Sequence, residues 1–121
     1  MKTHKDMDIW KIAVEFAEYI YLITRRYPRE ELYGLVSQMR RAVVSIGTNI
    51  SEGAARRTTK EFIQFLYIAR ASASELDTLL EISKRTNMTG VEEINNAQQQ
   101  NIILMKMLTA LIKQLNLSLN H

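Results

Sequence analysis

Apolar residues recur every three or four positions along almost the whole chain, which is the period of an α-helix. No stretch alternates apolar and polar residues long enough to predict a strand. A single proline, Pro28, interrupts the pattern, and turn-forming residues gather near Gly53 and Gly90. The sequence therefore predicts an all-α fold of four long helices joined by three short connections.

The predicted helices, all within a single domain of residues 1–121, span about residues 8–27, 31–52, 59–86 and 91–118. Asp8 is the expected N-cap of the first helix, and Thr58 with Glu61 forms a capping box for the third. Gly47 should mark a bend or a close helix contact, because glycine lowers helix propensity by roughly 1 kcal/mol. Short connections make consecutive helices antiparallel, so we expect an up-down-up-down four-helix bundle.

Composition excludes several classes of chemistry. The chain has no cysteine, hence no disulfide, thiolate nucleophile or Cys-ligated metal site. Its only histidines, His4 and His121, lie in the tails, whereas a ferritin-like di-metal site needs histidines on the helices. We therefore expect no enzyme activity, no cofactor and no metal.

The sequence also carries information on the compartment and on membrane insertion. The N-terminus lacks the apolar run of a signal peptide, which predicts a cytoplasmic protein. Lys106 and Lys113 interrupt the apolar run of the last predicted helix, so we expect no membrane span.

Positive charge is concentrated in the middle of the chain. The net charge is +3, but nine basic and four acidic residues between Arg25 and Arg70 give that segment +5. Eight of these nine cations are arginines, whose forked donors suit phosphate. Either they pair with glutamates between helices or they bind RNA or DNA. Nucleic-acid contact, with the cations converging at one end of the bundle, is expected for Arg40, Arg56, Arg57 and Lys60.

A polar stripe follows one face of the second predicted helix. At steps of three and four it contains Gln38, Arg41, Ser45, Asn49 and Glu52. Ser72 and Glu75 stand on the third helix, and we expect these groups to form a polar network across the bundle that sets helix register. Phosphate contact is the alternative for Arg41.

Helix 91–118 carries more apolar surface than one core seam needs, and helix 8–27 repeats this pattern. Large exposed apolar patches usually mark an interface. We expect a homo-oligomer whose interface contains Trp10, Ile102, Met105 and Ile112. The alternative is a wide stripe buried within one copy.

Several linked runs carry a family resemblance. They are Asp8–Lys11, Tyr33–Ala42, Ser45–Gly53, Lys60–Ala69 and Ser72–Leu76. These runs resemble the bacterial four-helix-bundle proteins called 23S ribosomal RNA intervening-sequence proteins, over about residues 6–116. The resemblance implies a cytoplasmic bundle with no established catalytic activity. Gly47 stands where the family often has proline, so a proline kink is not implied here.

The resemblance extends to the accessory variability determinants of diversity-generating retroelements, which are pentameric barrels that engage nucleic acid and a reverse transcriptase. It thus implies a homopentamer with a basic surface. Together with the charge pattern, it predicts a non-catalytic oligomer that binds RNA or DNA without base specificity. An oligomeric scaffold that docks a partner protein, without nucleic acid, is the alternative.

Overall fold

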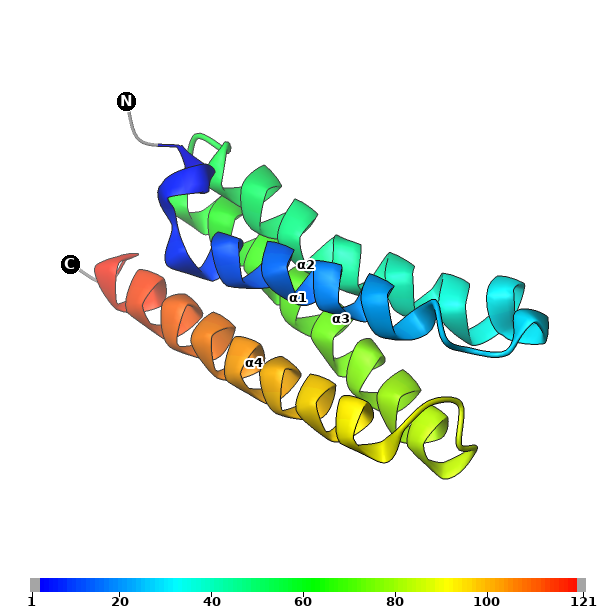
Figure 1. Ribbon diagram of the computed structural model, residues 1–121. Helices are drawn as coiled ribbons and strands as arrows, with labels where there is room; N and C mark the ends of the chain where they lie inside the picture. Colours follow the sequence, from blue (N-terminus) through cyan, green and yellow to red (C-terminus); the bar gives the residue numbers. More distant parts are fainter. Residues whose placement is uncertain (1–2, 120–121) are drawn as a thin grey trace.

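A computed structural model describes residues 3–119 as four long helices with no strand in that range (Figure 1). The helices are α1 (Asp8–Thr24), α2 (Ser37–Ala54), α3 (Thr59–Arg85) and α4 (Val91–Leu119). A 3-10 turn, His4–Asp6, precedes α1, and a second, Arg29–Glu31, leads into a π-helical turn, Leu32–Val36, before α2. The predicted all-α class is confirmed.

The helices form an antiparallel bundle in which each element packs against its neighbours in the chain and α1 also packs against α4. Consecutive helices run in opposite directions, and the α2–α3 turn lies at the end where α1 begins and α4 finishes (Figure 1). The up-down-up-down topology is therefore confirmed. Its consequence is that the α1–α2 side and the α3–α4 side are opposite sides of the bundle.

One apolar face of every helix forms the core. Ile20 of α1, Met39 of α2, Leu76 of α3 and Leu104 of α4 are fully buried. Burial of each such side chain stabilises the fold by roughly 1.5–3 kcal/mol. Asn101 is also fully buried, and its Nδ2 donates to a backbone oxygen of α3 at 2.9 Å, so one polar group ties α4 to α3 inside the core.

The first helix is shorter than its predicted span. It ends at Thr24, whose Oγ1 donates to the Ile20 oxygen at 2.7 Å, and the chain turns through Tyr27 before Pro28. Met7 is its N-cap, and Asp8 falls in the first turn instead. The helix therefore ends about one turn before the position expected from Pro28.

Of the two alternatives predicted for Gly47, a bend or a close helix contact, the bend is absent, because α2 runs through that residue without interruption. A Cβ added there would lie 3.8 Å from the Ala13 Cβ, so Gly47 marks a close approach of α1 and α2. The irregularity lies earlier, at Gly34, which has non-helical angles of φ −110° and ψ −109° within the π-helical turn. The predicted second helix, 31–52, is thus divided before Ser37.

Candidate functional site

The candidate cations lie at two ends of the bundle. Arg40 and Arg41 stand in the first turns of α2, whereas Arg56, Arg57 and Lys60 flank the turn after it. Sixteen residues separate Arg40 from Arg56, which is about 24 Å of helical rise. The expected convergence at one end does not occur, because α2 itself holds the two groups apart.

At the α2–α3 turn, Arg56 is the cation that contacts other side chains. Its Nη2 lies 3.4 Å from Glu52 Oε2, and its guanidinium lies over the Phe65 ring at 4.7 Å from the centroid. Arg57 and Lys60 are exposed, and their side chains contact none of the described polar groups. The α3 N-terminus adds its own partial positive charge, so this turn is a cationic corner.

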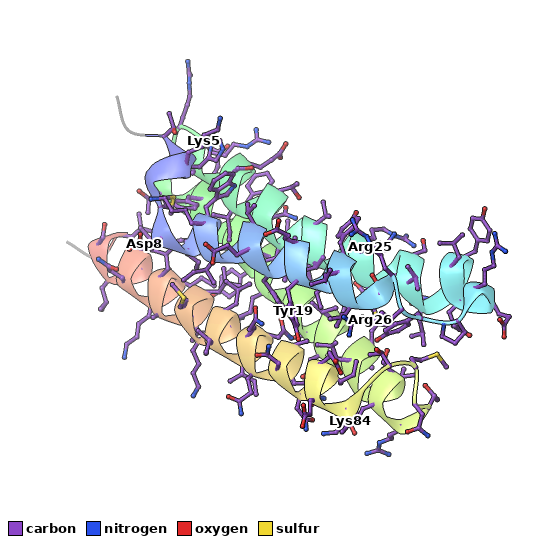
Figure 2. All side chains as sticks on the ribbon, in the orientation of Figure 1. Lys5, Asp8, Tyr19, Arg25, Arg26 and Lys84 are labelled. Atoms are coloured by element: carbon purple, nitrogen blue, oxygen red, sulfur yellow. The ribbon has the colours of Figure 1, made fainter. Side chains whose placement is uncertain are left out.

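At the opposite end, Arg40 joins α2 to α1. Its Nε donates to Thr24 Oγ1 at 3.0 Å, and its guanidinium lies over the Tyr21 ring at 4.6 Å from the centroid. Arg41 is exposed, with no ion pair or hydrogen bond to the side chains placed by the structure. Figure 2 shows Arg25 beside the same α1–α2 connection. Arg40 is thus partly committed to the fold, whereas Arg41 is available.

Ion pairs do not neutralise the central cations. Among the side chains that the structure places, the ion pairs are Arg26–Glu93, Arg56–Glu52 and Arg85–Glu81. Only the first links segments distant in sequence, the turn after α1 and the start of α4. Of the nine central basic residues, only Arg26 and Arg56 therefore have an acidic partner. The interpretation that these arginines mainly link helices through glutamates does not describe the structure.

The predicted polar network is smaller than expected. Ser72 Oγ donates to Ser45 Oγ at 2.8 Å, and Asn49 Nδ2 donates to Ser45 Oγ at 3.0 Å. Gln38, Arg41 and Glu75 are exposed and make no hydrogen bond within the described part of the chain, and Glu52 pairs along its own helix with Arg56. Only the middle of the stripe lies on the α2–α3 contact, which is why the outer members are left in solvent.

An apolar groove runs between α1 and α2. Trp10, Val14 and Val44 line it above Ala13 and Gly47, whose small size lets the helices approach closely. Trp10 is half-buried, with its ring centroid 5.1 Å from that of His4, and Val14 and Val44 are 44% and 40% exposed. We call this surface the α1–α2 groove.

The opposite side carries a second apolar surface, the α3–α4 face, formed by Ile102, Met105, Thr109 and Ala110 with Lys106, Lys113 and Asp77 around them. Ile102 is 47% exposed and Met105 is half-buried. Ile112, expected on this exposed stripe, is instead 4% exposed and belongs to the core. It follows Leu104 and Leu108 at four-residue steps, each of which rotates by only about 40°.

Helix α4 also satisfies the length and composition criteria for a membrane span, with a mean hydropathy of 1.4 over its most apolar window. The mostly buried core helices of soluble proteins pass the same test, but only 17% of this window is buried. The high hydropathy of α4 therefore reflects apolar side chains that the core of the bundle does not bury.

Two titratable groups of the described residues have displaced pKa values. A hydrogen bond from Arg85, then one from Gln98, lowers the pKa of Glu81, and burial raises the pKa of Tyr27. Among the described residues, no three histidine, aspartate or glutamate side chains gather closely enough to hold a metal ion.

The profile of the 23S rRNA-intervening sequence protein family matches residues 5–110. The chain belongs to this family. It is also similar to the crystal structure of a protein of unknown function, described as a member of the S23 ribosomal protein family from Bacteroides thetaiotaomicron VPI-5482. The two share 27% identity and a TM-score of 0.81, over 87% of this chain and 98% of that one. No curated protein matches this chain significantly.

Two exposed features of this intervening-sequence protein were not identified from its sequence. Ile103 and Leu117 are 53% and 54% exposed on α4, and the seven-residue spacing through Ala110 could have shown that they share a face. Tyr33, in the π-helical turn, is 93% exposed. The glycine at position 34 was the sequence signal for an irregular turn, but the apolar pattern around it predicted one continuous helix.

Proposed function

We propose that this protein is a non-catalytic, self-associating bundle that binds RNA or DNA through backbone phosphates. The observation that carries the proposal is the set of arginine and lysine side chains left without an acidic partner. Arg41, Arg57 and Lys60 are exposed and engage none of the described groups, so their charge is available to a polyanion. The matching family is named for the intervening sequences of 23S rRNA, and this name states no binding partner.

Binding of this kind is independent of base sequence and strongly dependent on salt. Each phosphate contact releases counterions, and the slope of log K against log salt changes by roughly 0.9 for each contact on a duplex. A single copy offers few contacts at each end, so several copies acting together bind far more tightly than one.

Self-association uses the two apolar surfaces. The α1–α2 groove with Trp10, and the α3–α4 face with Ile102 and Met105, lie on opposite sides of the bundle. We infer a head-to-tail contact in which the groove of one copy receives the face of the next. A contact between two different surfaces builds a ring when the rotation per copy closes, and the pentamer that the resemblance implies is such a ring.

The alternative function is an oligomeric scaffold that docks a protein partner. The same apolar surfaces favour it, because they are available to any chain with a complementary apolar face.

A salt series with a generic RNA hairpin tests the proposal. The variant Arg57→Glu/Lys60→Glu removes two free cations and leaves the Arg56–Glu52 pair intact. We expect hairpin affinity at low salt to fall at least about tenfold and the salt slope to become shallower. The matched control is Lys5→Glu/Lys11→Glu, which makes the same charge change at two exposed lysines outside the central segment and should have a much smaller effect. Absence of binding by the natural protein at low salt, or affinity indifferent to salt, would favour the scaffold.

A further inference from the structure

The π-helical turn between α1 and α2 presents an aromatic ring that the fold does not use. Tyr33 is 93% exposed and its neighbour Leu32 is 45% exposed. The turn is nevertheless anchored, because Glu31 Oε1 accepts a hydrogen bond from the Leu35 nitrogen at 3.4 Å.

The same turn forms one wall of a surface hollow that also contains two arginines. Tyr21, Leu32, Tyr33, Arg40 and Arg41 line it, and we call it the tyrosine–arginine hollow. Arg40 is held in place by Thr24 Oγ1 at 3.0 Å and by the Tyr21 ring below it. Arg41 is exposed and has no partner among the described side chains. The side chains that line the hollow therefore supply two cations and no carboxylate within the part of the chain that the structure describes.

This combination of groups selects a particular ligand chemistry. Flat aromatic and apolar surfaces stack with nucleobases, and arginine forks bind phosphate oxygens. A base-paired duplex covers the faces of its bases, whereas an unpaired nucleotide exposes them next to its phosphate. The hollow therefore suits single-stranded better than double-stranded nucleic acid.

We propose that the tyrosine–arginine hollow binds an unpaired nucleotide of single-stranded RNA or DNA, with the base on Tyr33 and the phosphate on Arg41. This inference rests on the proposed function and deepens it, because it adds a preference for unpaired strands to general phosphate binding. The cationic corner at Arg57 and Lys60 lies at the other end of α2, so the two contributions are separable by mutation.

The test compares two probes on the full-length protein, a short fluorescein-labelled oligo(U) and a blunt RNA duplex of matched length. Tyr33→Ala should weaken oligo(U) binding by roughly five- to a hundredfold, the range for loss of one stacked base. Duplex affinity should change less than about twofold, because duplex binding depends on phosphate charge. Tyr33→Trp should retain oligo(U) affinity, and Arg41→Ala should weaken both probes.

Tyr67→Ala is the matched control, because Tyr67 is another exposed tyrosine beside an arginine, with Arg70 at 4.9 Å from its ring centroid, on α3. It should leave both affinities unchanged. Unaltered oligo(U) affinity in Tyr33→Ala would overturn the inference and leave the proposed function standing. Failure of the natural protein to bind either probe would overturn both. Displacement of oligo(U) by poly-glutamate, with affinity equally sensitive to Tyr33→Ala, would instead make the hollow a protein-docking site and overturn the inference.

Discussion

Single residues of α2 show how closely the neighbouring helices approach. A Cβ added at Gly47 would lie 3.8 Å from the Ala13 Cβ, an ordinary contact distance. At Gly53 it would lie 2.8 Å from Phe62 Cδ1 and 2.8 Å from the Phe65 Cβ, which no real Cβ tolerates without movement of α3. The same substitution therefore has opposite signs at two positions of one helix.

Gly47→Ala should raise the free energy of unfolding by about 0.5–1 kcal/mol, because alanine has the better helix propensity and meets no obstacle. Gly53→Ala should lower it by about 1–3 kcal/mol through overpacking against the start of α3. Urea unfolding followed by helical circular dichroism measures both. A destabilised Gly47→Ala variant would show that α1 and α2 are closer together than described.

At the scale of the helices, α3 and α4 are joined near their connection by a hydrogen-bonded carboxylate. Glu81 of α3 accepts from Arg85 Nε at 2.9 Å and from Gln98 Nε2 of α4 at 3.0 Å. These bonds, Arg85 first, lower the pKa of Glu81 below its ordinary value of 4.5. The ionised carboxylate therefore favours the folded state above that pH, and its contribution is lost as the pH falls through the lower folded value.

Glu81→Gln should flatten the dependence of stability on pH in that acidic range and should leave the slope near neutral pH unchanged. The measurement is the urea midpoint at a series of pH values between neutral and acid. Glu75→Gln is the control, since Glu75 is an exposed glutamate of the same helix without a partner among the described residues. Equal flattening in the two variants would mean that the bonds to Arg85 and Gln98 do not shift the Glu81 equilibrium.

Helix positions and topology could be predicted from the sequence because they depend on local rules. The apolar period and caps such as Thr58 placed the starts of α3 and α4 at their observed residues. The turn around Gly34 was not predicted, because the apolar residues on either side of it keep the period of one continuous helix. The placement of Arg40 over Tyr21 likewise depends on the register of α1 against α2, which local patterns do not fix. The sequence therefore predicted which kinds of residue form the candidate site, but not that they lie at two separate ends of the bundle.

At the scale of the whole molecule, the self-association proposed above uses the two apolar surfaces as its contacts between copies. A groove that received another groove would give a closed dimer, whereas a groove that receives the α3–α4 face continues from copy to copy. Val14 and Ile102 are 44% and 47% exposed, so a charge at either position opposes association without entering the core. Ile112 is unsuitable for such a test, because it is only 4% exposed and a charge there would unfold the bundle.

Val14→Glu and Ile102→Glu should each reduce the solution mass to one copy, because each variant loses one of the two surfaces that every contact in a ring requires. Mixed together, they should form a dimer and nothing larger, since the intact α3–α4 face of the first fits the intact α1–α2 groove of the second. Light scattering on the separate and mixed variants measures this. If Ile102→Glu remains oligomeric while Val14→Glu does not, the contact is groove to groove. If the natural protein is monomeric at micromolar concentration, the proposed self-association is wrong.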